Sequence, residues 1–200
     1  MRNIKDKRQS EITRSMLVRL LVTIAGFAIG LTAFSRIKEV SLWASESAEA
    51  FKIVRAERQI MRIFLVDLAN SSFLLTVVFM LGLSAWAKIC VPIINVIFGI
   101  GGGVSFAAMF SDNKKTGALI CAVIIMPRLL LVTYAFLCGC MEATQMSGLF
   151  MQVCFCESAS NGINRRIRSY CAKFLILWCI MGIGATVDVV CSMCIGGIII

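Results

Sequence analysis

The stretch that most constrains this chain runs from residue 89 to residue 110 and contains no charged side chain. Its sequence is ICVPIINVIFGIGGGVSFAAMF. Because a helix needs about 20 mostly apolar residues to cross a bilayer, this run is long enough to be a membrane span. Two further apolar runs flank it closely, at 63–87 and 117–141. We therefore expect these three runs to form a compact membrane unit that the rest of the chain anchors.

The composition favours a membrane protein over a soluble domain. Hydrophobic residues make up 59% of the 200 residues, charged residues only 16%, and the mean hydropathy is +0.88. Soluble domains are about a quarter charged. The chain has 20 lysines and arginines against 11 aspartates and glutamates, and the basic residues gather at the edges of apolar runs. This placement favours lipid headgroups over nucleic acid as the partner.

Five apolar runs predict an all-α, polytopic integral membrane protein in which residues 1–200 form a single domain. The predicted spans cover 16–34, 63–87, 91–110, 117–141 and 174–195, and a basic inner loop covers 142–173. Arg19 lies near the start of the first span, so we expect its side chain to extend back to the headgroups. Lysines and arginines concentrate on the cytoplasmic side of membrane proteins, and their tally here favours a cytoplasmic N-terminus and an outside C-terminus in the cell membrane.

The outer segment 35–62 is polar and mixed in charge, but mostly apolar residues recur in it every three to four positions. This spacing is typical of one face of an amphipathic helix. The residues on that face are Val40, Trp43, Ser47, Phe51, Val54 and Met61. Two interpretations remain open. The helix lies on the outer membrane surface or against the bundle, or it docks a partner protein.

The third span carries a cluster of glycines at Gly99, Gly101, Gly102 and Gly103. A phosphate-binding loop would need Gly-Lys-Ser/Thr after it, and Val104-Ser105-Phe106 does not supply that pattern. Gly99 and Gly103 instead have the GxxxG spacing that lets two helix backbones approach closely. A flexible break in a substrate path is the alternative. We expect Pro92 to open this span, because proline in the first turn of a helix loses no hydrogen bond.

Arg128 is the costliest residue to place in the predicted spans. It follows Pro127, which interrupts the fourth span near its middle. A charged side chain at that depth costs about 2.5–3.5 kcal/mol on insertion scales, so it should face protein or water. We expect it to pair with Asp188 in the fifth span, with Asp67 in the second span as the alternative partner. Such a pair either fixes helix register or belongs to a substrate or proton site.

The sequence offers no catalytic constellation. The chain has no histidine, which is the commonest general base and metal ligand. Most of its ten cysteines lie in or beside apolar runs, where cysteine usually packs as a small hydrophobe. Asp67 and Asp188 would be the candidates for an intramembrane protease, and neither has a supporting motif. We therefore expect no enzyme, no cofactor and no metal site.

Two stretches resemble the stage II sporulation protein M family of small polytopic membrane proteins. They are IFLVDLANSSFLLTVVFMLGLSAWAKICVPIINVIFGIGGGVSF and AVIIMPRLLLVTYAFLCGCMEATQMS, together under half of the chain. The residues that carry the resemblance are Asn70, Leu81-Gly82, Pro92, Gly99, Gly103 and Met126-Pro127-Arg128.

The resemblance implies a non-enzymatic membrane scaffold. In spore-formers the family's protein recruits two peptidoglycan-degrading partners, stage II sporulation proteins D and P, to the septal membrane during engulfment. Segment 35–62 would then be the contact surface for these partners. The alternative function, which rests on Arg128, Asp188 and the glycine-rich span, is a membrane subunit of a permease or transporter complex.

Overall fold

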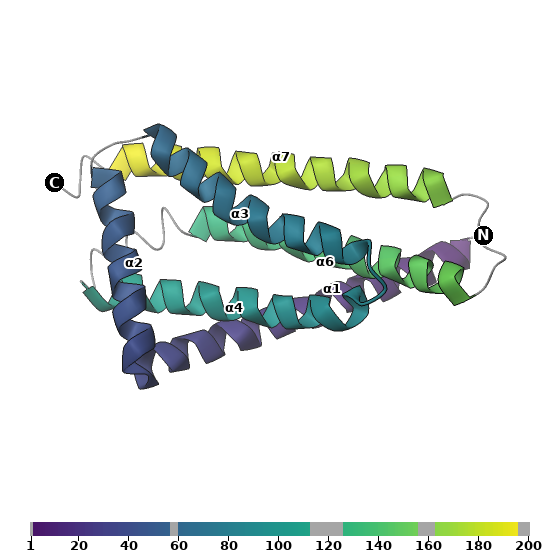
Figure 1. Ribbon diagram of the computed structural model, residues 1–200, viewed down its shortest axis with the longest axis horizontal. Coiled ribbons are helices and arrows are strands. Elements are labelled where there is room, and N and C mark those ends of the chain that lie inside the picture. Colours follow the sequence, from purple (N-terminus) through teal and green to yellow (C-terminus); the bar gives the residue numbers. More distant parts are fainter. Residues whose placement is uncertain (1, 57–59, 113–125, 156–162, 196–200) are drawn as a thin grey trace.

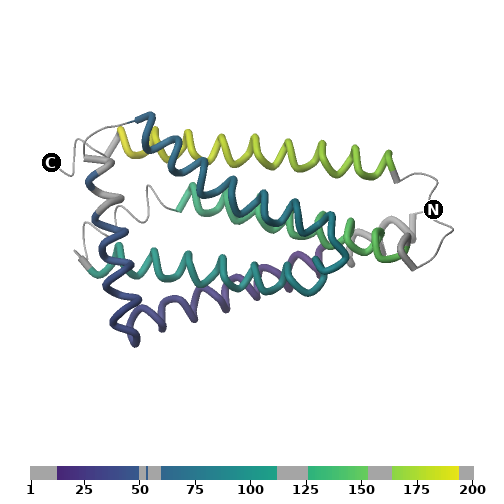
Figure 2. Tube along the Cα trace, in the orientation of Figure 1, coloured from purple at the N-terminus to yellow at the C-terminus, as the bar shows by residue number. Residues whose placement is uncertain are grey.

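The computed structural model describes residues 2–56, 60–112, 126–155 and 163–195 (Figures 1 and 2). These residues form helices and contain no strand. The helices are α1 (Arg2–Arg36), α2 (Lys38–Ala56), α3 (Ile60–Gly82), α4 (Ala87–Asp112), α6 (Met126–Phe155) and α7 (Ile163–Ile195). Five of them, all except α2, contain stretches that are long and apolar enough to cross a membrane. The predicted class, an all-α polytopic membrane protein, is confirmed.

The five long helices run lengthwise through the molecule, and α2 crosses them at one end (Figure 1). Each long helix reverses the direction of the one before it, so α1 begins at one end of the bundle and α7 finishes at the other (Figure 1). Because the number of long helices is odd, the start of the first and the end of the last must lie at opposite ends of the bundle. The α2 end is therefore the end at which α7 finishes, and the turn between α3 and α4 lies at the opposite end.

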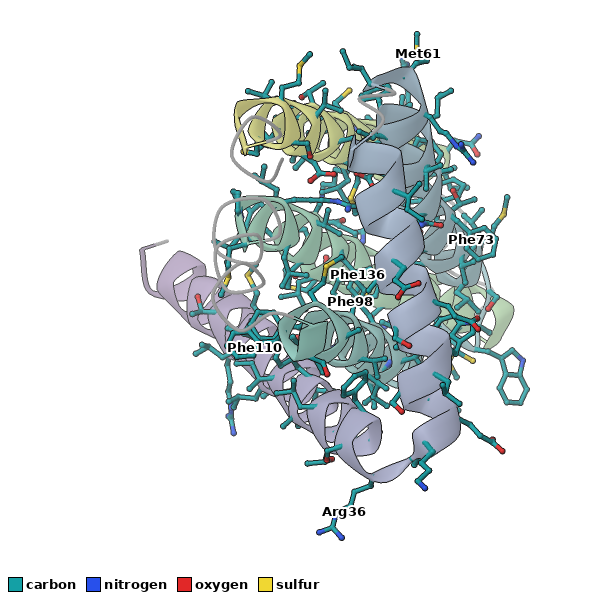
Figure 3. The ribbon with its side chains drawn as sticks, turned by 90° about the vertical axis from the view of Figure 1, so that its left-hand side faces the viewer. Arg36, Met61, Phe73, Phe98, Phe110 and Phe136 are labelled. Atoms are coloured by element: carbon teal, nitrogen blue, oxygen red, sulfur yellow. The ribbon has the colours of Figure 1, made fainter. Side chains whose placement is uncertain are left out.

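The long helices pack as two groups, α1 with α4 and α3 with α6 and α7. Leu75 of α3, Phe136 of α6 and Phe174 of α7 are fully buried in the core of the second group. Phe98 of α4 joins the groups, because its ring centroid lies 4.4 Å from that of Phe136 (Figure 3). The prediction that the spans within 63–141 form one compact unit was therefore wrong, since the third span packs mainly against the first.

Glycines hold α1 and α4 close together. Gly26 and Gly30 on α1 lie against α4, and Gly99 and Gly103 on α4 lie against α1. A Cβ atom added to Gly26 would lie 2.7 Å from the Val96 carbonyl oxygen and 3.3 Å from the Gly99 Cα. No side chain fits at that separation. The close packing expected at Gly99 and Gly103 is present, and α1 contributes its own GxxxG pair to it.

Helix α2 packs on α4 through small residues. Ala44 and Ala48 are buried against Val104 and Ala108 of α4. Trp43, which the sequence placed on the apolar face of this helix, is 68% exposed. Alanine allows the helices to approach where the indole ring would not fit. The side of α2 that contacts α4 is therefore formed by Ala44 and Ala48 and not by Trp43.

Other members of the predicted α2 face have different outcomes. Val40 is partly buried against the same cluster, whereas Ser47 is exposed. Met61 belongs to α3 and is 70% exposed. The side chains of Phe51 and Val54 lie outside the described part of the chain.

Several predicted helix ends also differ from the structure. Helix α6 continues to Phe155 and α7 begins at Ile163, so most of the predicted inner loop 142–173 is helical. Residues 117–125 of the predicted fourth span lie outside the described residues, and the apolar stretch of α6 covers Met126–Gln152. Pro92 lies inside α4 and does not open it. The helix starts earlier, where the N–H groups of Ile89 and Cys90 donate to the Trp86 carbonyl.

The glycine contact predicts a position-specific loss of stability. In the Gly103→Ala variant the new Cβ atom would overlap the Phe27 carbonyl oxygen, so the two backbones must separate. We expect a loss of about 1–3 kcal/mol in the free energy of unfolding, measured by denaturation in detergent micelles. The matched control is Gly101→Ala on the same helix, where nothing lies within 4 Å of the added atom. Equal stability of the two variants would contradict the proposed role of the α1–α4 contact.

Candidate functional site

Arg128 lies between two carboxylates that come from two other helices. Its Nη1 atom is 3.0 Å from Oδ1 of Asp67 on α3 and 3.8 Å from Oδ2 of Asp188 on α7. Arg128 itself lies in the first turn of the described helix α6. We call these residues the ion triad. Of the two partners considered from the sequence, the alternative, Asp67, is the nearer, and both are present.

Alternating helix direction explains why the triad residues meet. Asp67 lies near the start of α3, Arg128 near the start of α6 and Asp188 near the end of α7. These three helix ends lie together at the α2 end of the bundle (Figure 1). The described apolar stretch of α6 covers Met126–Gln152 and so extends beyond the predicted end at 141. The residues before Met126 lie outside the described part of the chain, so the depth of Arg128 within its span stays a prediction.

Burial makes the triad electrostatically strong. The side-chain exposures of Arg128, Asp67 and Asp188 are 21%, 8% and 1%. Taking a charge out of water is costly, and the opposite charge nearby repays that cost only while the pairing geometry holds. The triad therefore joins α3, α6 and α7, and removing Arg128 would leave two buried carboxylates without their opposite charge.

The other candidate residues do not join the triad in one site. Gly99 and Gly103 lie at the contact with α1, and Pro92 is exposed on α4. Asn70 is exposed on α3. Pro127 is the second residue of the described helix α6, next to Arg128. The predicted candidates thus separate into an ionic site and a packing site, with Asn70 and Pro92 in neither.

A second polar network, which the sequence analysis missed, joins α1 and α4 at their closest approach. Asn95 Nδ2 donates a hydrogen bond of 2.9 Å to the Arg19 carbonyl oxygen. The Thr23 hydroxyl lies 2.9 Å from the same carbonyl and 3.1 Å from Asn95 Oδ1. The signal in the sequence was Asn95 itself, an amide within an otherwise apolar stretch of the third span. The structure shows that this amide is fully buried.

Arg19 extends this network to α6. Its Nη2 atom donates a hydrogen bond of 2.8 Å to the Thr144 hydroxyl, which in turn donates to the Cys140 carbonyl at 2.7 Å. The expectation that the Arg19 side chain extends back to the headgroups stays a prediction, and the structure adds a hydrogen bond that ties one of its nitrogens to α6. Its guanidinium is held between helices, at the end of the bundle opposite the ion triad.

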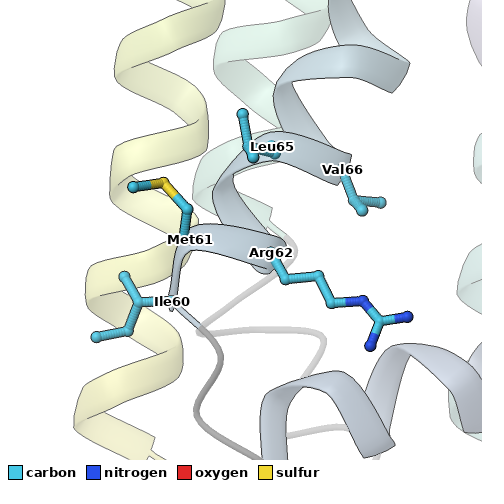
Figure 4. A pocket seen from close by; sticks show the side chains of 5 residues that line it. All are labelled: Ile60, Met61, Arg62, Leu65 and Val66. Atoms are coloured by element: carbon cyan, nitrogen blue, oxygen red, sulfur yellow. The ribbon is translucent and has the colours of Figure 1, made fainter.

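A further site among the described residues could be a metal-binding group or a hollow. No group of three or more cysteine, aspartate or glutamate side chains among them could hold a metal ion. A hollow at the start of α3 is lined by Ile60, Met61, Arg62, Leu65 and Val66 (Figure 4). All five belong to one helix and four are apolar, whereas a small-molecule site needs several polar groups that converge.

Comparison with known proteins gives no match. No family model matches the chain, no curated protein matches it, and no solved structure matches it. The similarity to the stage II sporulation protein M family therefore stays a prediction from the sequence. Functional proposals for this protein rest on the geometry of its described residues.

The triad distances predict unequal couplings in double-mutant cycles. We expect Arg128→Met and Asp67→Asn to be coupled by about 1–3 kcal/mol in the free energy of unfolding, because their charges are buried and close. Coupling with Asp188→Asn should be smaller, because that distance is 3.8 Å.

The matched control is the Lys173–Glu142 pair between α7 and α6. It has a shorter distance of 2.6 Å but side-chain exposures of 49% and 24%. Exposed pairs contribute at most about 1 kcal/mol. If the Arg128–Asp67 cycle gave no more coupling than this control, the triad would not be the structural clamp described above.

Proposed function

We propose that this protein is a non-enzymatic scaffold that holds partner proteins at a membrane. The observation that carries this proposal is the use of its buried charges. Arg128 is engaged by Asp67 and Asp188 from two neighbouring helices. Charged residues in membrane spans are often functional, but here they contact one another and tie helices together. A helical bundle whose buried charged groups contact one another, and thereby hold its own helices together, suits a scaffold.

The surface proposed to bind a partner is the side of α2 that faces away from α4. Leu42, Trp43 and Ile53 are 64%, 68% and 57% exposed there. Exposed aromatic and aliphatic side chains are enriched at the centres of protein interfaces. Helix α2 also crosses one end of the bundle, where a partner outside the hydrocarbon region can reach it (Figure 1).

The charge distribution supports an orientation in which α2 lies outside the cell. Basic side chains that are exposed at the opposite end include Arg14, Lys88, Arg165, Arg166 and Arg168. Positive residues concentrate on the cytoplasmic side, which would place α2 on the outer face. A scaffold of the stage II sporulation protein M kind would use that face to recruit the peptidoglycan-degrading proteins D and P.

A permease subunit is the second candidate, and the ion triad is the observation that favours it. Two carboxylates and one guanidinium in buried positions also fit a site for a proton or a charged substrate. Substrate-dependent flux into proteoliposomes that Arg128→Ala abolishes, without loss of folded protein, would support this candidate. The same result would overturn a function limited to scaffolding.

The scaffold proposal predicts that Trp43→Ala weakens binding of a peptidoglycan-degrading partner. Tryptophan is a frequent hot-spot residue, so we expect the amount of partner that co-purifies to fall by about tenfold. Trp86→Ala is the matched control, because Trp86 is also 68% exposed but lies before α4 at the other end of the bundle. Equal losses in both variants, or no such partner with the unchanged protein, would contradict the proposal.

A further inference from the structure

Basic side chains from two different helices lie against α6 at positions one helical turn apart. Arg19 of α1 donates its hydrogen bond to Thr144, and Lys88 of α4 lies over Gly148. A Cβ atom added to Gly148 would lie 3.5 Å from Lys88 Cε and 3.7 Å from Lys88 Nζ. Thr144 and Gly148 are four positions apart, so they lie one above the other on the same helix face, about 6 Å apart along the axis.

Within the described part of the chain, neither basic group forms an ion pair with a carboxylate. The ion pairs there involve Arg128 at the other end of the bundle and Lys173, which binds Glu142. Arg19 uses one donor on Thr144, whereas a guanidinium has five N–H donors in a planar fork. The Arg19 side chain is partly exposed, and no further hydrogen bond from its guanidinium is seen within the described part of the chain.

The depth of these groups matches the boundary between headgroups and hydrocarbon. Lys88 lies at the start of the apolar stretch Ala87–Ser111. Arg19 lies a little further inside the stretch Thr13–Arg36, about 9 Å from its beginning at 1.5 Å per residue. The phosphates of a bilayer lie just outside its hydrocarbon core, within reach of both side chains.

We propose that Arg19 and Lys88 bind the phosphate group of an anionic phospholipid where α1, α4 and α6 meet. Arginine contributes a planar pair of donors that matches two phosphate oxygens, and lysine contributes a mobile point charge. Thr144 is a positioning residue, because its hydroxyl fixes one guanidinium nitrogen and leaves the others free. The absence of a side chain at Gly148 leaves room above α6 for the lysine stem.

Lipid binding to the purified full chain tests this site. The probes are phosphatidylglycerol and phosphatidylcholine, added to the protein in neutral detergent and followed by native mass spectrometry and by thermal unfolding. We expect the unchanged protein to retain and be stabilised by phosphatidylglycerol in preference to phosphatidylcholine. Arg19→Gln and Lys88→Gln should each weaken phosphatidylglycerol binding about fivefold, and the double variant should lose the preference.

Three further variants separate this site from general charge effects. Arg165→Gln removes a basic residue that is exposed on α7 at the same end of the bundle, and it should leave binding unchanged. Thr144→Val should weaken binding and Thr144→Ser should restore it, because serine keeps the hydroxyl. Lys88 is exposed, so its variant remains informative if Arg19→Gln does not fold.

Two outcomes would overturn the proposal. One is equal loss of binding in Lys88→Gln and Arg165→Gln, which would mean that only the total charge matters. The other is stabilisation by inorganic phosphate that depends on Lys88 and Arg19 without any preference for phosphatidylglycerol, which would make this a site for a soluble anion.

Discussion

The close approach of α1 and α4 at their glycines is the contact on which much of this structure depends. Lipid tails are as apolar as leucine, so burial alone does not drive membrane helices together, and close packing has to do so. Gly26 and Gly99 bring the two backbones within reach of each other. Only at that separation can Asn95 reach across to the Arg19 carbonyl. The polar contact therefore follows from the packing and in turn fixes the register of the helices.

The two polar sites have different consequences for the bundle. At the α2 end, Arg128 joins α3, α6 and α7 through opposite charges that are largely buried. At the other end, Arg19 joins α1 to α6 through a neutral hydroxyl. The first site places one guanidinium beside two carboxylates, so its stability depends most on Arg128. The second site leaves the positive charge of Arg19 without a carboxylate partner in the described part of the chain. The stability of that site therefore depends on water or anions around the guanidinium.

Hydropathy was sufficient to predict the class and the number of spans, because bilayer thickness sets the length of an apolar helix. It could not predict which helices are neighbours. Phe73 is 71% exposed and Leu75 on the same helix is fully buried, yet both are strongly apolar. Where lipid and protein interior select the same residue types, periodicity does not identify the packed face.

Small and polar residues were the part of the sequence that predicted contacts between helices. The GxxxG spacing at Gly99 and Gly103 predicted a close contact, and the same spacing at Gly26 and Gly30 in the first span identifies its partner. The sequence identified both carboxylates as partners of Arg128, but it did not predict which of them is nearer. Asp67 is nearer, at 3.0 Å, than Asp188, at 3.8 Å. Helix tilt and the positions of the helix ends determine these distances, and the sequence does not give them.

The distribution of polar groups also bears on where this protein meets other molecules. A group that already has an opposite charge beside it gains little from a further ligand, because its desolvation has been repaid within the fold. That reasoning weakens the case for the ion triad as a binding site. It strengthens the case for surfaces where polar and apolar groups remain available, namely the outward side of α2 around Trp43 and the basic face formed by Arg19 and Lys88. These surfaces lie at opposite ends of the bundle, so the proposed protein contacts and the proposed lipid contact would not compete for the same part of the molecule.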